Sequence, residues 1–450
     1  MSGARLSIPS PSLVVMVGVA GSGKTTLGRR HFGASQIVGT DDCRALLSDD
    51  AVDQSVSDAA FRLAHLITDE RLRLGRLTVF DATSVQERHR QDLVAIAARH
   101  HLPTVAILLD LPVSTCLERD RQRVDRSVGR RIIEWQARAL DSGRAALRRE
   151  GFSEVHRLRS ARAAERVRFE IRPLSCDRRR ETGPFDIIGD VHGCAGELIT
   201  LLRRLGYRRR SARNAFRHGN GRRAIFLGDL VDRGPRIVDA VRIVDRMVKE
   251  GYAFSVPGNH DVDLVKSLKG RPRSPSPGLR ISLGQIDALP AGERARFAER
   301  FAAFVGALPA HLVLDGGRLA VAHAGLHDRY IGRESAAVLR FALHGETTGD
   351  VDRYGLPVRV DWAAGYHGAA TLVYGHTPVV KPEFQNNTVN IDTGCVYGGR
   401  LTALRYPEME IVDVPAARPY YQSPRLMLSR VGLRAETRAR PIREVRRPPA

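Results

Sequence analysis

The sequence predicts an α/β protein made of two successive units. In residues 13–110, short apolar runs alternate with helical periodicity, which favours a parallel sheet covered by helices on both faces. In residues 185–410, further short apolar runs each end at a polar residue or a glycine turn, which suits an αβ sandwich of two sheets. A chain of 450 residues is long enough for both units to bury a core.

The elements of the first unit follow from their residue patterns. Leu13–Val17 is an apolar strand that leads into a glycine-rich loop and a helix from Lys24. Residues 58–74 carry apolar groups at helical spacing. Leu77–Phe80 and Val105–Leu109 are further strands, and each ends at an acidic residue.

Composition and pattern together predict the domain boundaries. We expect a kinase-like unit over 12–160, a basic linker over 161–183, a phosphoesterase-like unit over 184–415 and a disordered Arg/Pro-rich tail over 422–450. The strands expected in the second unit are Phe185–Ile188, Ala224–Leu227, Ala253–Val256, Leu319–Ala322, Thr371–Tyr374 and Thr388–Ile391.

The net charge of +21 is the strongest signal in the composition. It favours polyanionic partners such as nucleic acid, although an Arg-rich host composition would produce the same excess. The five cysteines are scattered without a CxxC pair, which argues against disulfides or structural zinc and favours the reducing cytoplasm. No apolar run is long enough to predict a membrane partner, and homo-oligomerisation is left open.

A phosphate-binding motif directly follows the first strand. Residues 18–25 read GVAGSGKT, which fits G-x-x-x-x-G-K-[ST]. Backbone N–H groups of such a loop surround phosphate oxygens, the lysine neutralises the β and γ phosphates, and the threonine hydroxyl binds Mg²⁺. We therefore expect ATP and Mg²⁺ as cofactors. The nucleotide-binding candidates are Gly18, Gly21, Ser22, Gly23, Lys24, Thr25 and Thr26.

Carboxylates follow the next two strands, where ligands of a parallel sheet bind. Asp41 or Asp42 is placed to take the proton of an acceptor hydroxyl, or alternatively to cap the helix that begins near Cys43. Asp81 either binds Mg²⁺ through water, positions the acceptor or forms a strand-end turn.

Four arginines lie at helical spacing after the last strand of the first unit. Arg119, Arg123, Arg126 and Arg130 would share one face of a single helix. Because like charges at this spacing repel, the stripe favours a lid that closes over triphosphate, with a solvated basic face as the alternative.

The second unit contains an ordered series of Asp, His and Asn residues, each directly after an apolar strand. The pattern predicts two metal ions: Asp190, His192 and Asp229 hold one, and Asn259, His323 and His376 hold the other, with Asp229 bridging. These oxygen and nitrogen ligands suit Mn²⁺, Fe²⁺ or Ni²⁺ at least as well as Zn²⁺. Two such ions activate a water and clamp phosphoryl oxygens.

Three neighbouring residues complete the predicted phosphoesterase chemistry. His260 can protonate the leaving oxygen, Asp232 can orient its imidazole, and Arg233 can form two hydrogen bonds with the phosphate.

With these motifs in order, the chain over nearly residues 12–415 resembles the bacterial polynucleotide kinase-phosphatases of RNA repair, and its second half resembles calcineurin-like metallophosphoesterases. Further matching stretches are residues 81–86, 149–152 and 390–399. The resemblance implies that Asp41 is the base for a 5′-hydroxyl and that Arg44 holds the acceptor. It also implies that Arg123 and Arg126 act on ATP phosphates and that Asp392 supports the phosphatase site.

The resemblance further implies RNA or DNA ends as partners, with 5′ phosphorylation and removal of 2′, 3′ or 2′,3′-cyclic phosphates. Two departures stand out. The acceptor motif reads Gly39-Thr40-Asp41-Asp42, where relatives have one Asp followed by an apolar residue, and the K-x-D-G motif of the family's ligase-like domain is missing. We therefore expect a separate ligase to seal the ends.

Two other functions remain as hypotheses. One is a small-molecule kinase fused to a phosphoprotein or nucleotide phosphatase. The other is a nucleotide-sensing regulator whose P-loop binds without transfer, against which the two complete catalytic sets weigh.

Overall fold

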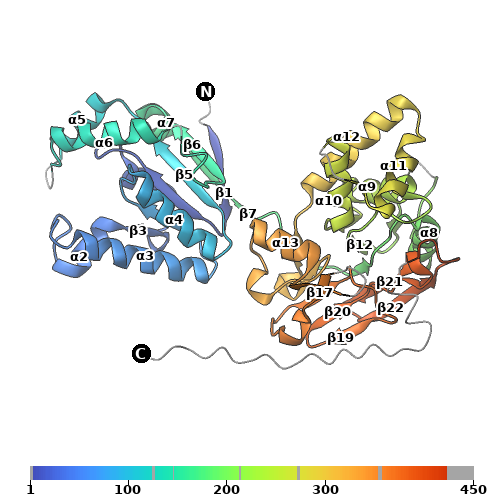
Figure 1. The fold of residues 1–450 in the computed structure, drawn as a ribbon. Coiled ribbons are helices and arrows are strands. Elements are labelled where there is room, and N and C mark those ends of the chain that lie inside the picture. Colours follow the sequence, from blue (N-terminus) through green and yellow to red (C-terminus); the bar gives the residue numbers. More distant parts are fainter. Residues whose placement is uncertain are drawn as a thin grey trace.

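The computed structural model describes residues 4–123, 127–144, 146–211, 214–270, 274–352 and 357–422. Figure 1 shows two α/β units, one formed by the first part of the chain and one by the second, connected near β7. The predicted fold class is confirmed. Among the described residues, no helix combines the length and the apolar character that crossing a membrane would require.

The first unit contains a parallel sheet with strand order β3-β4-β2-β5-β6, and helices pack on both of its sides (Figure 1). Its strands are β2 (Leu13–Val17), β3 (Ile37–Gly39), β4 (Thr78–Asp81), β5 (Thr104–Leu109) and β6 (Glu154–Leu158). Its helices are α1 (Lys24–His31), α2 (Thr40–Ser48), α3 (Ser57–Arg73), α4 (Glu87–Arg99), α5 (Val113–Arg121), α6 (Arg130–Gly143) and α7 (Ala161–Arg166), with the 3-10 turn η1 (Ala34–Gln36). Every residue of the central β2 is buried, as expected for a strand covered on both faces. The strand order reverses at β2, so the loop after it lies where ligands of such sheets bind.

The segment 161–183 differs from the linker that its Arg-rich composition suggested. It contains α7 and then β7 (Arg168–Pro173), which pairs in parallel with β1 (Arg5–Ser10). After β7, β8 (Asp177–Arg178) joins a sheet of the second unit beside β14. Backbone pairing with an available edge strand orders this segment, and composition does not reveal such an edge.

The second unit is a two-sheet sandwich with strand orders β13-β12-β9-β21-β22 and β19-β20-β18-β15-β14-β8. The strands of the first sheet are β9 (Phe185–Ile188), β12 (Arg223–Phe226), β13 (Ala253–Ser255), β21 (Arg400–Tyr406) and β22 (Glu410–Pro415). The other sheet adds β14 (His311–Leu314), β15 (Leu319–Ala322), β18 (Thr371–Tyr374), β19 (Glu383–Gln385) and β20 (Thr388–Asn390). A buried apolar layer that includes Ile187, Ile225 and Val321 lies between the sheets.

Helices cover the outer faces of the sandwich. They are α8 (Ala195–Arg204), α9 (Ile237–Lys249), α10 (Asn259–Leu268), α11 (Pro277–Asp287), α12 (Ala291–Ala307) and α13 (Ala336–His344). Two short ribbons, β10 (Tyr207–Arg208) with β11 (Arg217–His218) and β16 (Thr347–Val351) with β17 (Pro357–Arg359), lie outside the main sheets. The buried residues of α8 and α9 form a second core on the five-stranded sheet.

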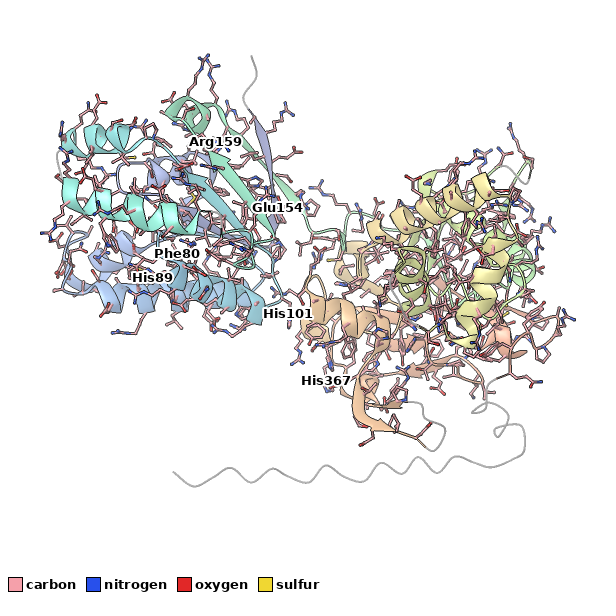
Figure 2. The ribbon with its side chains drawn as sticks, turned by 45° about the horizontal axis from the view of Figure 1, so that its top comes forward. Phe80, His89, His101, Glu154, Arg159 and His367 are labelled. Carbon is pink, nitrogen blue, oxygen red and sulfur yellow. The ribbon has the colours of Figure 1, made fainter. Side chains whose placement is uncertain are left out.

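A small polar contact joins the two units. The Arg333 guanidinium donates hydrogen bonds to the carbonyl oxygens of Leu72 (2.9 Å) and Arg73 (2.8 Å). His101, which Figure 2 places on the side of the first unit that faces the second, contacts the Ser335 hydroxyl through Nδ1 at 3.0 Å. The expected tail, 422–450, lies outside the described residues beyond Gln422.

Candidate functional site

The glycine-rich loop between β2 and α1 curls into a tight cradle. Gly21 adopts φ 78°, and a Cβ there would lie 2.3 Å from the Cys116 carbonyl oxygen, so only glycine fits. The Lys24 ammonium folds over the loop and donates to the carbonyl oxygens of Gly18 (2.8 Å) and Val19 (2.9 Å). Burial lowers the pKa of Lys24 to about 8, and the nearby Asp81 partly opposes that shift. The strand, glycine loop and helix therefore follow one another as the motif predicts, and the predicted contact of Lys24 with phosphates stays a prediction.

Asp81 lies against the same cradle. Burial raises its pKa, whereas a hydrogen bond with Thr25 and the charge of Lys24 lower it in part. The carboxylate therefore adjoins the hydroxyl that the motif assigns to Mg²⁺, which favours a role at the metal or acceptor over that of a simple turn former.

The two candidate bases point to different partners. Both lie in the first turn of α2, and Gly39 rather than either carboxylate is the N-cap. Asp41 pairs with the buried Arg44, and its charge acts on both Lys24 and Asp81. Asp42 instead lies 3.8 Å from the exposed Arg29, although its charge also acts on Asp81. The geometry therefore favours Asp41 as the carboxylate beside the phosphate cradle.

The predicted single arginine helix is wrong. Helix α5 ends at Arg121 and α6 begins at Arg130, because the buried Asp120 accepts the backbone N–H groups of Val128 and Gly129 and turns the chain. Arg119 nevertheless donates to the Ser22 carbonyl oxygen at 3.4 Å. Arg126 lies outside the described residues. A cavity of 260 Å³ at the cradle is lined by Gly21, Ser22, Gly23, Thr26, Leu27, Arg30, Arg119, Arg123, Ala161, Ala164 and Glu165.

Two sets of buried polar residues stabilise this site and were not predicted from the sequence. The buried Gln136 accepts the Ala20 N–H at 2.7 Å and so holds the phosphate loop to α6. Arg90 and Glu150 form a fully buried ion pair at 2.7 Å, and Arg90 also donates to the carbonyl oxygens of Ser84 and Val85. The pair thus joins two of the stretches that carried the resemblance to the repair enzymes.

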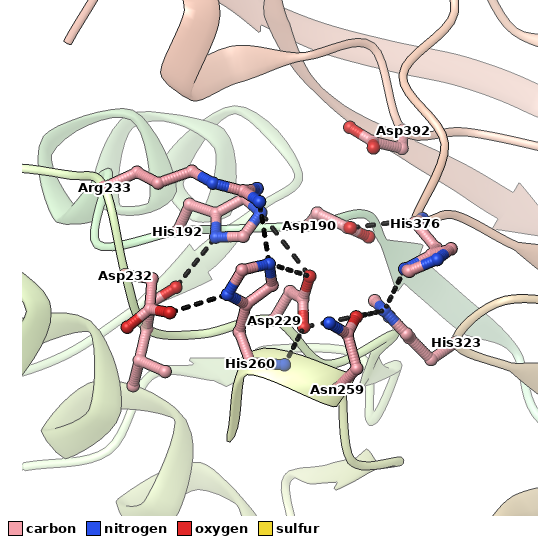
Figure 3. A network of polar contacts seen from close by, with 12 residues as sticks. Asp190, His192, Asp229, Asp232, Arg233, Asn259, His260, His323, His376 and Asp392 are labelled. Atoms are coloured by element: carbon pink, nitrogen blue, oxygen red, sulfur yellow. Dashed lines mark hydrogen bonds and ion pairs between the residues drawn. The ribbon is translucent and has the colours of Figure 1, made fainter. Parts of the chain in front are cut away.

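The six predicted metal ligands of the second unit converge (Figure 3). They follow β9, β12, β13, β15 and β18, whose ends gather at one edge of the sandwich. The Asp229 oxygens lie 3.5 Å from His192 Nε2 on one side and 3.5 Å from His323 Nε2 on the other. His323 Nε2 also lies 3.0 Å from both Asn259 Oδ1 and His376 Nδ1. Asp229 thus occupies the bridging position that the sequence predicts.

The nitrogen and oxygen atoms that face the centre of this cluster are suited to binding cations, because many of them present lone pairs to one another. His192 and His323 donate from Nδ1 to the carbonyl oxygens of Val231 (2.7 Å) and Leu227 (2.9 Å), which leaves an Nε2 lone pair on each ring facing the cluster. Within the described residues, the buried Asp190 Oδ1 and His376 Nε2 have no hydrogen-bond partner. Lone pairs directed at lone pairs are costly unless a cation lies between them.

Burial and mutual charge govern the protonation of the ligands. Burial, together with Asp392 and Asp229, raises the pKa of Asp190 well above its usual value. Burial also raises the pKa of Asp229, but four surrounding imidazoles outweigh it and hold that pKa below the usual value. Burial lowers the pKa of both His192 and His376, so these rings are neutral and able to bind metal. Two groups, Asp229 with His192 and His260, and Asp229 with His323 and His376, each have the proximity that a metal ion needs.

The predicted catalytic residues line the same cluster. His260 Nδ1 lies 2.6 Å from Asp232 Oδ2, and the Arg233 guanidinium reaches Nε2 of His260 (2.7 Å) and of His192 (2.8 Å). Burial lowers the pKa of His260, but Asp229 and the hydrogen bond with Asp232 raise it above the ordinary value. Asp392 is buried, accepts the Gly394 N–H at 3.0 Å and has its pKa raised by burial to about 6.

Four further residues, missed from the sequence, support this site. Ser282 on α11 donates to Asp232 Oδ1, and Asp261 accepts the N–H groups of Leu230 and Gly258 and so ties two ligand loops together. The rings of Tyr397 and Tyr421 lie 5.5 Å and 5.9 Å from the Arg233 guanidinium carbon. Tyr397 falls within the matching stretch 390–399, which was the available signal. Asp261 directly follows His260 in the ordered series, which was a signal for it as well, and spacing offered none for Ser282 and Tyr421.

Comparison with known proteins divides the chain in the same way. The AAA domain family matches residues 13–149, and the calcineurin-like phosphoesterase family matches residues 183–380. Bis(5′-nucleosyl)-tetraphosphatase PrpE [asymmetrical] of a Geobacillus species is 46% identical over 235 residues, which are 52% of this chain and 95% of that protein. The protein of the same name from Anoxybacillus flavithermus is 44% identical over 236 residues, 52% of this chain and 96% of its own.

A solved serine/threonine phosphatase from Saccharomyces cerevisiae is 13% identical with a TM-score of 0.33, over 55% of this chain and 84% of that one. The calcineurin-like phosphoesterases use divalent metals, and the P-loop unit binds nucleotide, in agreement with the two sites described above. Through its second unit, which spans nearly the whole of these tetraphosphatases, the chain belongs to the calcineurin-like phosphoesterases, and it joins that enzyme unit to a kinase-like P-loop unit.

Proposed function

We propose that this chain is a bifunctional nucleic-acid end-healing enzyme that acts in RNA repair. In this proposal the first unit is an ATP-dependent polynucleotide 5′-hydroxyl kinase, and the second is a metal-dependent 2′,3′-phosphatase and cyclic phosphodiesterase. The observation that carries the proposal is the Asp41–Arg44 pair beside the phosphate cradle, in a chain that also contains a binuclear phosphoesterase cluster.

The kinase step uses residues around the cradle. Asp41 accepts the proton of the 5′-hydroxyl while Arg44 holds the acceptor end. The new O–P bond forms as the bond between the γ phosphorus and the bridging oxygen of ATP breaks, and ADP leaves. Lys24 and Arg119, which already surround the loop carbonyls, turn to the phosphate oxygens, and Arg123 supports them from the lining of the cavity.

The phosphoesterase step uses the converged cluster of the second unit. Two divalent ions such as Mn²⁺ or Ni²⁺, held by the six ligands, would supply Lewis acidity and an activated water. Arg233 turns from the two imidazoles to the phosphate, and this movement frees Nε2 of His260. His260, held through Nδ1 by Asp232, then protonates the leaving ribose oxygen.

The charge of the chain supports a polynucleotide substrate. A net charge of +21 attracts RNA or DNA ends by counterion release, and a separate ligase would join the healed ends.

A specific observation favours a second candidate function. The identity of 46% across nearly all of a PrpE protein favours hydrolysis of bis(5′-nucleosyl) tetraphosphates by the second unit. In that case the first unit would phosphorylate a small molecule rather than a nucleic acid.

One experiment separates the two candidates. The full chain is incubated with γ-labelled ATP and a 5′-hydroxyl oligonucleotide, and separately with a 3′-phosphorylated oligonucleotide and with diadenosine tetraphosphate. End healing predicts label transfer that Lys24→Ala abolishes and His192→Ala preserves, and phosphate release with the opposite sensitivity. If neither RNA nor DNA ends accept label while the tetraphosphate is cleaved, the second candidate stands.

A further inference from the structure

A large basic cavity lies in the second unit and has no part in the chemistry described so far. It has a volume of 740 Å³, within the range of about 300–1,000 Å³ typical of ligand sites. It lies between α9 and α12, at the helical end of the second unit (Figure 1). We call it the arginine cavity after six of its lining residues: Arg209, Arg236, Arg242, Arg246, Arg296 and Arg300.

The arginine cavity is lined by six arginines and three carboxylates. Three acidic residues line it, and each is paired with an arginine: Asp239 with Arg236, Glu293 with Arg242 and Asp245 with Arg300. Three lining arginines therefore exceed the number of lining carboxylates.

The local electrostatics reflect this excess. Burial lowers the pKa of Arg209, and the guanidinium groups of Arg203, Arg246 and Arg236 lower it further, whereas Asp239 partly opposes the shift. Like charges held together around one cavity wall repel one another unless an anion enters. The lining is therefore arranged for a ligand with several negative charges.

The floor of the cavity is apolar and aromatic. Phe297 and Phe301 are buried, with ring centroids 6.0 Å apart and planes at 4°, and Phe304 lies beside them. The Arg209 guanidinium is itself held at 4.5 Å over the Phe216 ring. Because these rings are buried in the core of the second unit, they hold the cavity wall in place, and contact with a ligand falls to the arginines.

The position of the cavity connects it to the phosphoesterase site. Arg236 follows Arg233 by three residues, and its N–H donates at 3.0 Å to the carbonyl oxygen of Gly193, the neighbour of the ligand His192. From Arg236 the lining arginines continue along α9 to Arg246, a rise of about 15 Å at 1.5 Å per residue. That length corresponds to about four nucleotides of a stacked strand at 3.4 Å each.

Resting on the function proposed above, we propose that the arginine cavity binds the sugar–phosphate backbone of a single-stranded polynucleotide whose terminal phosphate lies at the binuclear site. The cavity would therefore select long substrates over mononucleotides.

The test compares substrate length in two charge-matched variants. One is Arg209→Ala with Arg246→Ala. The control is Arg294→Ala with Arg340→Ala, which removes the same charge from exposed positions outside the cavity lining, one of them on α12. The probes are p-nitrophenyl phosphate, a 3′-phosphorylated mononucleotide, a 3′-phosphorylated hexanucleotide and diadenosine tetraphosphate. Metal-free binding of the hexanucleotide is followed by fluorescence anisotropy over a salt series.

The cavity variant is expected to lose about tenfold in kcat/KM on the hexanucleotide and less than about twofold on the two smallest probes. Its salt slope for binding should fall by about 1.4, or 0.7 for each lost contact to a single strand. If the alanines lower the melting temperature, the pair Arg209→Gln with Arg246→Gln repeats the test with similar side-chain length.

Two results would overturn the inference. One is equal behaviour of the cavity and control variants on the hexanucleotide, and the other is a loss confined to diadenosine tetraphosphate, which would make a small polyphosphate the occupant. Failure of the wild type to hydrolyse any probe would instead reject the proposed phosphoesterase function, and the binding slope would still test the cavity by itself.

Discussion

The hydrogen bond between Asp232 and His260 offers the sharpest test of the phosphoesterase chemistry. Asp232→Asn keeps the size of the side chain but replaces the acceptor at 2.6 Å from His260 Nδ1 with an amide. The amide neither stabilises an imidazolium nor fixes the tautomer that leaves a proton for the substrate at Nε2. Proton donation to the leaving oxygen should therefore weaken, whereas binding of the phosphate should not.

The size of the effect follows from the contact. A buried hydrogen bond to a charged group contributes about 1.5–3 kcal/mol. At 1.36 kcal/mol per tenfold change in rate, its loss predicts a fall of about 10- to 150-fold in kcat for a ribonucleotide 3′-phosphate. For p-nitrophenyl phosphate, whose leaving group needs no proton, the fall should be less than about threefold.

The assay measures phosphate release from both substrates with Mn²⁺ present. Asp287→Asn is the matched control, because it makes the same substitution at an exposed position on α11, the helix that carries Ser282. Equal losses on both substrates, or no loss on the nucleotide, would show that His260 does not act as the acid through Asp232.

Three other predictions concern the first unit and overall stability. Asp41→Asn should lower 5′-phosphorylation, measured as label transfer, by about 100- to 10,000-fold, and Asp42→Asn should lower it by less than about threefold. The reason is that only Asp41 pairs with the buried Arg44. The reverse order of the two losses would assign the base to Asp42. Arg90→Met should lower the free energy of unfolding by about 3–5 kcal/mol, since it leaves the buried Glu150 without its ion-pair partner. Adding Glu150→Leu should recover most of that loss, as measured by urea titration. If the losses of the two single variants instead add in the double variant, the reasoning is contradicted. Burial lowers the pKa of His311 to about 3, so the folded state resists its protonation. Its contribution to stability is complete above pH 6.5 and falls as the pH drops toward 3, by about 2 kcal/mol at pH 5. His311→Gln should therefore lose less stability than the wild type between pH 7 and pH 5, as urea midpoints would show.

Much of the candidate site could be read from the sequence because its residues follow strands directly. Asp190, Asp229 and His323 each come at or just after the end of an apolar run, and strand ends of one sandwich edge meet regardless of their distance along the chain. The phosphate loop before Lys24 could be predicted for a similar reason. Its glycines curve the backbone and the helix that follows begins at once, so the loop depends only on residues close in sequence. Such features can be predicted from the spacing of apolar residues and from the point where a strand or helix ends.

The sequence by itself determined the two-unit fold, the phosphate loop and the set of metal ligands, because each depends on short-range patterns. Only the tertiary structure decided that the arginines after Cys116 belong to separate segments, since the buried Asp120 turns the chain there. It also decided that Asp41 pairs with the buried Arg44 whereas Asp42 lies near Arg29, and that arginines from three different segments line one cavity of the second unit. These outcomes depend on which side chains of different helices and strands contact one another. The spacing of apolar residues along the sequence does not determine those contacts.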